Sequence, residues 1–445
     1  MKNTLILTDK KMDDKNMNTR SPFFCRPSFC RLILTALLLS PLAALADAGT
    51  LRADEPTLGA DYTVVFDHHA GIPMESGYIY SGAPSLARTS DGALLCSVPL
   101  NIRGKPRGAV KTLLFFRSDD GGASWTRSPG ESDATHGTLF SHGKALYFLG
   151  FGKYVNNPPD SGLKIIRSDD DGQTWTAPVT LFQGPYVNTA GSYVIRNGQF
   201  YWCMDDAGGS AWQKPGNTYV IAGDLSKDLL DPASWRISAP LPMPELPPSM
   251  SRPGKSGGAI LEGNVVEVNG RLQLSWRYLI AERDSVGIGV ICDLKDDGKK
   301  LDYRFRQFHA LPGAQSQFNI VHDPVGGLYW MNANLPTRTQ DQDPAWNAQL
   351  SKNPNYKLPA GHERRILALY CSFDALNWLP AGYIVVWPEV RQASQYCGLL
   401  IDGDDLLVAA RTSRAGRNQH DNDLTTFHRV KNFRERAAFL LPGKK

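Results

Sequence analysis

Side chains that could do chemistry lie near the ends of short β-type segments in this 445-residue sequence. Glu262 opens a hairpin that ends near Arg277. Arg364 and Arg365 open a later segment, and Tyr396 lies at the start of the last one. Guanidinium groups bind carboxylates through charge-assisted, often bidentate hydrogen bonds. A tyrosine, with a side-chain pKa of about 10, is a poor nucleophile unless a base lies beside it. Which of these groups act together depends on the elements that position them.

A repeated octapeptide indicates what those elements are. Residues 118–125 and 168–175 both read Ser-x-Asp-x-Gly-x-Ser/Thr-Trp, with a spacing of 50 residues that is typical of repeat architectures. Each copy follows an apolar β-type run. Asp and Ser side chains bind local backbone N–H groups, Gly allows a positive φ, and Trp anchors neighbouring hairpins. The repeat predicts packed β-hairpins.

These octapeptides resemble the Asp-boxes, or BNR repeats, of the sialidase (neuraminidase) superfamily. The resemblance implies an all-β chain folded as a six-bladed β-propeller of four-stranded antiparallel blades. Residues 372–378 resemble a third, degenerate copy, and we expect Asp231–Trp235 to play the same structural role in the third unit. The Asp-box lies away from the active site in that superfamily, so it indicates fold rather than function.

Tight-turn signals divide the chain into six strand–turn–strand units. The units are 83–128, 135–180, 190–238, 257–308, 315–381 and 394–433. We expect the strand 62–66 to pair with the last unit and close the ring. The segments 240–253 and 335–363 are expected to be loops.

The N-terminus has the features of a targeting segment. Residues 1–31 are polar and basic, residues 32–45 are apolar, and small residues stand at the cleavage positions before Asp47. We interpret 1–46 as a signal peptide with a long n-region, followed by a single sialidase-like domain at 55–440. Pro41 interrupts an apolar run that is already shorter than the roughly 20 residues of a membrane span. The sequence therefore predicts a secreted or periplasmic protein without a stable membrane span.

Charge and cysteine content exclude several other classes. A formal charge of +4 is small for this length and argues against nucleic-acid binding. Five scattered cysteines remain after cleavage, an odd number that does not form a disulfide framework. No zinc-binding spacing occurs, so we predict neither a metal nor a cofactor, and we expect a monomer.

The resemblance also assigns roles at one mouth of the propeller channel, where ligands of propellers usually bind. Glu262 resembles the sialidase glutamate that activates the nucleophile, and Arg277 resembles a carboxylate-binding arginine. Arg364, with Arg365 as the alternative, resembles a second such arginine. Tyr396 resembles the tyrosine that attacks the anomeric carbon, the known exception to the carboxylate pair of most glycosidases.

Two sialidase features are absent. Gly82-Ala83-Pro84 stands where sialidases have Arg-Ile-Pro, and the loop 101–111, where they have an acidic aspartate, contains no carboxylate. We predict His136 as the acid, because it begins the inner strand of the second unit and imidazole titrates near neutrality. The other candidates for the missing cation or acid are Arg103, Lys105, Arg107, His68, His69 and Glu75.

The preferred prediction is a secreted sialidase-like exo-glycosidase acting on an acidic, carboxylate-bearing sugar that need not be sialic acid. Its support is that Glu262, Arg277, Arg364 and Tyr396 follow the sialidase order across three successive units. One alternative is a uronate-polysaccharide lyase on a propeller scaffold. A second alternative is a non-catalytic glycan-binding propeller. The lyase would use Arg277 to neutralise the carboxylate and His136, His142 and Tyr278 to move protons.

Overall fold

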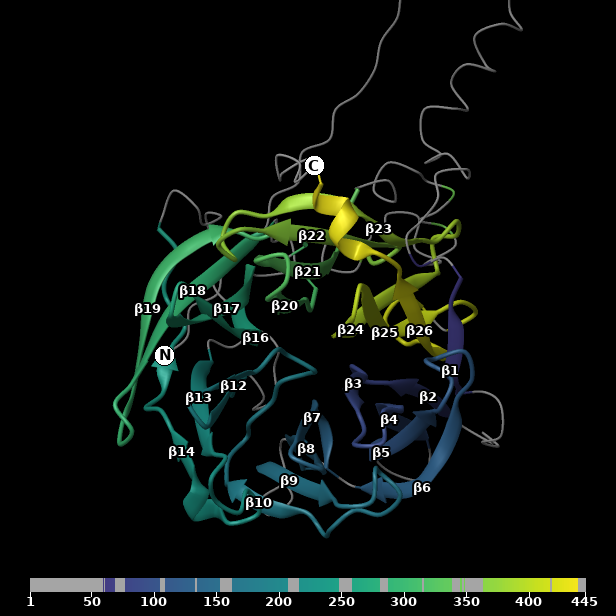
Figure 1. Cartoon of the computed structure of the whole chain (residues 1–445). Helices are drawn as coiled ribbons and strands as arrows, with labels where there is room; N and C mark the ends of the chain where they lie inside the picture. The colour runs from purple at the N-terminus through teal and green to yellow at the C-terminus, as the bar shows by residue number, and fades with distance from the viewer. Residues whose placement is uncertain are drawn as a thin grey trace, which may run out of the picture. The chain divides into compact units, whose positions relative to one another are not determined.

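Six antiparallel β-sheets follow one another around a common axis, as the ribbons in Figure 1 show. The computed structural model describes residues 59, 61–68, 77–104, 109–132, 134–152, 162–206, 216–247, 258–280, 287–313, 316–337, 345, 348, 363–416 and 418–438. All of them belong to the compact unit Ala53–Lys445. The predicted fold class, an all-β six-bladed propeller, is confirmed. The predicted signal peptide and most of the loop 335–363 lie outside the described residues.

The first three blades use consecutive strands. The first contains β2 (Gly77–Ser81), β3 (Ser85–Arg88), β4 (Leu94–Gly104), β5 (Ala109–Ser118) and β6 (Thr126–Ser132). The second contains β7 (Thr135–His142), β8 (Ala145–Phe151), β9 (Leu163–Ser168) and β10 (Val179–Phe182). The third contains β11 (Val194–Arg196), β12 (Gln199–Asp205), β13 (Asn217–Asp224), the 3-10 helix η2 (Pro232–Ser234), β14 (Trp235–Ile237) and β15 (Leu241–Pro242). The segment 240–253, expected to be a loop, thus begins with a short strand that pairs with β13.

The last three blades complete the ring. The fourth contains β16 (Gly258–Val268), β17 (Arg271–Ile280), β18 (Ile288–Asp296) and β19 (Leu301–Ala310). The fifth contains β20 (Asn319–Asp323), β21 (Leu328–Asn334), β22 (Ile366–Ser372) and β23 (Leu379–Val386). The sixth contains β24 (Ala393–Asp402), β25 (Asp405–Ser413), β26 (Leu424–Val430) and β1 (Thr63–Asp67), and the 3-10 helix η6 (Phe433–Ala437) follows β26.

The ring closes through its N-terminal strand. β1 pairs antiparallel with β26, so Figure 1 shows the purple start of the described chain beside its yellow end. This confirms the pairing predicted for 62–66. Trp125, the last residue of the first octapeptide, donates from Nε1 to Oγ1 of Thr63 in β1 over 3.2 Å.

Both octapeptides form the turns that their residue types predict. In the first, Oγ of Ser118 accepts from the N–H of Gly122 over 2.7 Å, and Asp120 accepts from the N–H of Ser124 over 2.9 Å. The second copy repeats both bonds, and its Trp175 stacks on Phe115 at 4.2 Å between ring centroids. Local hydrogen bonds fix the conformation of each turn, and its tryptophan packs against the preceding blade.

An apolar cluster fills each junction between neighbouring blades. One cluster joins β12 and β13 of the third blade to the strands of the fourth, for example, and others join the remaining pairs around the ring. The five cysteines of the described residues are buried and free, and they pack in these sheets as small apolar side chains. Burial of this apolar surface holds the blades together.

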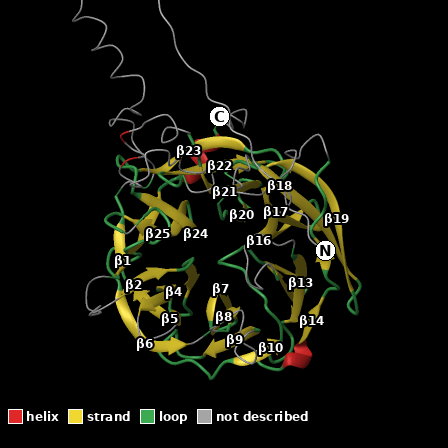
Figure 2. Ribbon diagram, turned by 180° about the vertical axis from the view of Figure 1, so that it is seen from behind, coloured by secondary structure: helices red, strands yellow, loops and turns green. Residues whose placement is uncertain are grey.

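The inner strands of the blades are β3, β7, β11, β16, β20 and β24, each at one edge of its sheet. Figures 1 and 2 both show β7, β16, β20 and β24 nearest the axis. We call the end at which they start the channel mouth and the opposite end the turn end. Every inner strand reaches the turn end at a glycine with positive φ, as the turn signals predict. These glycines are Gly92, Gly143, Gly198, Gly270, Gly327 and Gly403.

Candidate active site at the channel mouth

The three residues predicted to be catalytic share one backbone feature. Glu262, Tyr396 and His136 have positive φ angles of 53°, 51° and 52°. Each lies at a β-bulge, where the pairing of β16 with β17, of β24 with β25 and of β7 with β8 shifts. The left-handed region disfavours a residue with a Cβ atom, and a bulge re-aims the side chain that it contains. Inner strands of alternate blades therefore present the three side chains in the same way.

The strands next to these bulges carry matching arginines in two of the blades. Arg277 pairs with Leu261, the residue before Glu262. Arg411 pairs with Gln395, the residue before Tyr396. Arg411, which the sequence analysis did not select, is therefore the counterpart of Arg277 in the sixth blade. The signal that would reveal it is its place near the end of the second strand of its unit.

Glu262 forms a buried ion pair with Arg277. The distance from Nη2 of Arg277 to Oε2 of Glu262 is 2.7 Å, and the two side chains are 3% and 5% exposed. The backbone N–H of Glu262 donates to Oδ2 of the buried Asp205 over 3.0 Å. Burial raises the pKa of Glu262, while the charges of Arg277 and Arg364 and a hydrogen bond with Tyr396 oppose that rise. A carboxylate of raised pKa is a better proton acceptor than an ordinary one.

Tyr396 lies between guanidinium groups as well as beside Glu262. The Cζ atoms of Arg364 and Arg411 each lie 5.2 Å from the centroid of its ring. This distance is within the range of a cation–π interaction. Two positive charges therefore lie close to the phenol ring of Tyr396.

The structure separates the two adjacent arginines of the fifth blade. Arg364 donates from Nη1 to Oε1 of Gln395, and burial lowers its pKa to about 10. Arg365 donates from Nη1 to the carbonyl of Trp387 over 2.9 Å, on the side of β23. Only Arg364 joins the cluster around Tyr396, which we call the mouth cluster: Glu262, Arg277, Arg364, Tyr396 and Arg411.

His136 lies beside the segment that replaces the sialidase Arg-Ile-Pro. A Cβ atom added to Gly82 would lie 2.5 Å from the imidazole of His136, so the ring covers this glycine. The next residue, Ala83, packs in a small apolar cluster with Tyr396 and Ala190. Oδ1 of Asn101 lies 3.4 Å from Nε2 of His136. His136 and Tyr396 thus lie next to consecutive residues of one segment.

A histidine–aspartate pair, His420 and Asp421, also lies at the mouth. Nδ1 of His420 is 2.8 Å from Oδ1 of Asp421, and the imidazole lies 6.4 Å from the ring of Tyr396. Burial and the charge of Arg411 lower the pKa of His420, which favours a neutral imidazole. The pair follows β25 in the loop toward β26, and only the folded ring brings it next to Tyr396.

The other candidate residues are elsewhere. His142 bonds the carbonyl of Leu225 at the turn end, and the Tyr278 hydroxyl donates to the carbonyl of Pro244 over 2.9 Å. His68 is buried against Thr425. Of the residues predicted for a lyase, His142 and Tyr278 thus make their contacts away from the mouth cluster. His69, Glu75, Lys105, Arg107 and the side chain of Arg103 lie outside the described residues.

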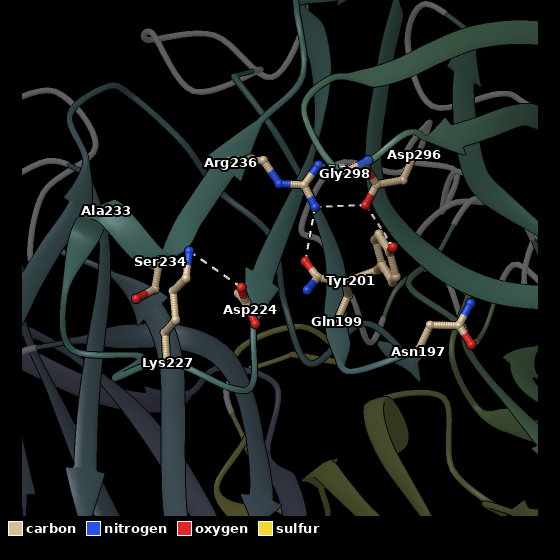
Figure 3. A pocket seen from close by; sticks show the side chains of 10 residues that line it. All are labelled: Asn197, Gln199, Tyr201, Asp224, Lys227, Ala233, Ser234, Arg236, Asp296 and Gly298. Atoms are coloured by element: carbon tan, nitrogen blue, oxygen red, sulfur yellow. Dashed lines mark hydrogen bonds and ion pairs between the residues drawn. The ribbon is translucent and has the colours of Figure 1, made fainter.

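Two cavities lie outside the mouth cluster. One of about 410 Å³ follows the inner strands along the axis, and it is lined by Ala190, which also contacts Tyr396. The other, of about 360 Å³, lies at the turn end of the third and fourth blades (Figure 3). Its charged groups pair with each other, since Arg236 binds Asp296 over 2.5 Å and Tyr201 donates to the same carboxylate. The polar side chains that line this pocket therefore bind the third blade to the fourth.

The described part of the chain contains neither a cluster of metal ligands nor a membrane-spanning helix. No group of three or more His, Cys, Asp and Glu side chains there is arranged to hold a metal ion. Of the helices that the structure describes, none has the length and apolar character needed to cross a membrane.

Comparison with known proteins gives structural matches only. Neither a protein-family model nor a curated protein matches the sequence. A mutant of Trypanosoma rangeli sialidase displaying trans-sialidase activity matches with a TM-score of 0.53 and 16% identity, over 86% of this chain and 59% of that chain. Trypanosoma rangeli sialidase in complex with 2,3-difluorosialic acid, a covalent intermediate, matches with a TM-score of 0.53 and 15% identity, over 85% of this chain and 58% of that chain.

A protein of unknown function from Dyadobacter fermentans matches over nearly its whole length. Its TM-score is 0.52 at 14% identity, over 84% of this chain and 98% of that chain. The present chain spans less than two thirds of the length of the two sialidase chains. Because the sequence identities are low, these matches show a similarity of fold alone. The chain has a sialidase-like six-bladed β-propeller fold.

Proposed function

We propose that this protein is an exo-acting glycoside hydrolase for a carboxylate-bearing sugar. The observation that carries the proposal is the mouth cluster, in which Glu262 pairs with Arg277 at 2.7 Å and the guanidinium groups of Arg364 and Arg411 lie 5.2 Å from the ring centroid of Tyr396. Tyr396 is the nucleophile and Glu262 its base, while Arg277 and Arg364 bind the substrate carboxylate. The fold shared with sialidases is consistent with this assignment.

The proposed reaction has two displacement steps. Glu262 accepts the phenol proton of Tyr396, whose oxygen forms a bond to the anomeric carbon while the bond to the leaving oxygen breaks. The leaving oxygen takes a proton from an acid, for which we propose His136. Water then attacks the anomeric carbon and gives a proton to His136, while the bond to Tyr396 breaks and Glu262 returns its proton to the phenol oxygen, so that each group regains its first state and the sum is hydrolysis.

A phenol suits this site for an electrostatic reason. A carboxylate nucleophile would face the carboxylate of the substrate at close range, and like charges repel strongly where water is excluded. Neutral Tyr396 avoids that repulsion before the attack, and Arg364 and Arg411, each 5.2 Å from its ring centroid, stabilise the charge that develops.

The location and assembly remain part of the proposal. We infer export to the periplasm or the medium from residues 1–46, and a monomer from the self-contained ring. Mass spectrometry of the mature protein and its elution volume in size-exclusion chromatography test these two statements.

The deciding experiment is product analysis combined with trapping. The purified protein is incubated with 4-methylumbelliferyl glycosides of sialic acid and of uronic acids, and with uronate polymers, with and without EDTA. Release of a free acidic monosaccharide supports the hydrolase. An unsaturated product that absorbs in the ultraviolet supports a lyase instead, and binding without any product supports a glycan-binding propeller.

Trapping identifies the nucleophile. A 2,3-difluoro analogue of the sugar that is released should leave a covalent adduct on the peptide that contains Tyr396, located by mass spectrometry. An adduct on a different residue contradicts the assignment. So does the case in which the wild type and Tyr396→Phe both turn over substrate and neither forms an adduct.

A further inference from the structure

The bulge that contains Glu262 is held by side chains of the neighbouring third blade. Oδ2 of Asp205, the last residue of β12, accepts from the N–H of Glu262 over 3.0 Å. Nδ2 of Asn188 donates to the carbonyl of the next residue, Gly263, over 3.4 Å, and to that of Cys203 in β12 over 2.6 Å. Two consecutive residues of the fourth blade therefore have hydrogen-bond partners in the third.

The residue after these two is fixed from both sides. Oδ1 of Asn264 accepts from the N–H of Ser192 in the third blade over 3.0 Å, and its Nδ2 donates to the carbonyl of Phe318 in the fifth over 3.1 Å. The backbones are in close contact as well, because a Cβ atom added to Gly191 would lie 2.4 Å from the carbonyl oxygen of Gly263. The polar side chains in these contacts are buried, and hydrogen bonds are stronger where water is excluded.

The backbone of Glu262 needs such support. Its φ of 53° is left-handed, a conformation that a residue with a Cβ atom keeps only where its surroundings impose it. The bulge takes Glu262 out of the register between β16 and β17, and its N–H finds an acceptor in Asp205 of another sheet. A buried N–H that loses its acceptor is unfavourable. Without Asp205, Glu262 should therefore change conformation, and its carboxylate should turn away from Arg277, which now lies 2.7 Å from it.

We propose that Asp205 is a positioning residue, which holds Glu262 in the conformation that keeps its carboxylate within the mouth cluster. This inference rests on the proposed function, because it assumes that Glu262 acts as the base. Asp205 acts through the backbone N–H of Glu262 and not by touching the sugar. The third blade, which contributes no residue to the mouth cluster, thus serves to shape it.

The test uses two replacements of Asp205 in the full-length protein, with the glycoside that the wild type hydrolyses. Asp205→Leu has a similar size but cannot accept the N–H of Glu262. Its kcat should fall by about a hundredfold, because a displacement of about 1 Å costs that much. Its KM should stay within about threefold of wild type, since the arginines remain in place. Asp205→Asn keeps an oxygen at the same position and should be about tenfold faster than Asp205→Leu, because a neutral amide oxygen accepts more weakly than a carboxylate.

Crystal structures give a readout that does not depend on activity. In Asp205→Leu, Glu262 should leave the left-handed region, and the distance from its Oε2 to Nη2 of Arg277 should exceed the 2.7 Å of the wild type. Circular dichroism shows whether each variant has kept its fold. If Asp205→Leu does not fold, Asp205→Ser takes its place, because its shorter side chain does not reach the N–H of Glu262.

Asp206→Leu is the matched control. Asp206 is the next residue of the same blade, but its Oδ2 accepts from the hydroxyl of Tyr219 and from Nδ2 of Asn217, both over 2.8 Å. These partners belong to β13 of the third blade. The control should therefore leave both kcat and the conformation of Glu262 unchanged.

The outcomes separate this inference from the proposed function. If the wild type hydrolyses no glycoside but Glu262 moves in Asp205→Leu, then Asp205 holds Glu262 and the hydrolase fails. If hydrolysis occurs but folded Asp205→Leu keeps the wild-type kcat, or if Asp206→Leu loses as much, the inference is overturned and the hydrolase stands. A Glu262 that keeps its φ and its ion pair in Asp205→Leu overturns the inference in either case.

Discussion

Arginines at the two ends of the blades have opposite electrostatic surroundings. At the turn end, Arg117 pairs with Asp91 at 2.6 Å, and the bond raises its pKa. Arg236 pairs with Asp296 at 2.5 Å with the same effect. At the channel mouth, burial lowers the pKa values of Arg364 and Arg411. Carboxylates thus raise the pKa of arginines at the turn end, whereas burial lowers the pKa of two arginines at the mouth, where Arg277 pairs with Glu262.

Backbone conformation differs between the ends in the same sense. Positive φ angles at the inner hairpin turns belong to glycines and, in two of the turns, also to Asn197 and Asn269, residue types that adopt them at low steric cost. At the mouth they belong to Glu262, Tyr396 and His136, where the conformation costs about 1 to 3 kcal/mol each. Strained backbone and buried positive charge coincide at the mouth, where the proposed function places the site, while the ion pairs of the turn end hold the blades together.

Removal of the Tyr396 hydroxyl should have the largest effect. Tyr396→Phe keeps the ring between Arg364 and Arg411 but cannot form a covalent bond to the sugar. We expect kcat to fall by about a thousandfold or more, with ligand affinity within about threefold of wild type. Steady-state kinetics and calorimetry check this. Unchanged turnover would show that Tyr396 is not the nucleophile. The mouth would then have no catalytic role to distinguish it from the turn end.

Replacement of Arg277 should change both rate and pH dependence. Its charge opposes the rise in the pKa of Glu262 that burial causes, so in Arg277→Gln that pKa rises further. Glu262 must be ionised to act as a base, and the acid limb of kcat/KM should therefore move to higher pH. At neutral pH we expect a loss of about a hundredfold, because a buried ion pair is broken.

The matched control for this pH profile is Arg236→Gln at the turn end. It removes an arginine–aspartate pair without touching the mouth, so its acid limb should coincide with that of the wild type. An Arg277→Gln profile that also coincides with the wild type would show that a group other than Glu262 sets the acid limb.

Loss of a turn-end pair should change stability rather than activity. Arg434 binds the buried Asp323 through two bonds of 2.7 and 2.8 Å. Burial alone would raise the pKa of Asp323, but the bonds from Arg434 and from backbone N–H groups lower it below the usual value. Arg434→Gln should reduce the free energy of unfolding by about 2 kcal/mol at neutral pH, with kcat unchanged.

The sign of the pH dependence follows from the lowered pKa. Ionised Asp323 stabilises the fold above its unfolded pKa, and this stabilisation is lost as the pH falls through the folded value. The stability difference between the wild type and Arg434→Gln should therefore shrink in acid. Urea unfolding at neutral and acidic pH measures it, and a difference that stays constant contradicts the role of this pair.

A single turn bond should have the smallest effect. In Ser118→Ala the N–H of Gly122 loses its acceptor at 2.7 Å, and we expect the free energy of unfolding to fall by about 1 kcal/mol. Activity should not change. Ser168→Ala removes the equivalent bond of the second octapeptide at 2.9 Å, so the two variants should lose similar amounts of stability.

Much of the fold could be predicted because it depends on short stretches of chain. The octapeptides at 118–125 and 168–175, the glycine turns and the closing strand 62–66 are all found where the patterns place them. The candidate site was predictable in part. Glu262, Arg277, Arg364 and Tyr396 assemble at one mouth, although their roles are still predictions.

Arg411, His420 and Asp421 were missed because their signals are not local. In the sequence, nothing distinguishes Arg411 from the other residues of its strand. Only the register of the sheet shows that it lies opposite Gln395, as Arg277 lies opposite Leu261. Ring closure then brings it to Tyr80 of the first blade.

The sequence by itself determined the number of blades, the turns between strands and the order of the polar groups along the chain. These depend on alternating apolar residues and on hydrogen bonds that span a few residues. Only the tertiary structure decided that Arg364 rather than Arg365 faces Tyr396, and that a third arginine lies beside it. The physical reason is that the surroundings of a buried charge are set by bulges, register and closure of the ring, which combine residues from opposite ends of the chain.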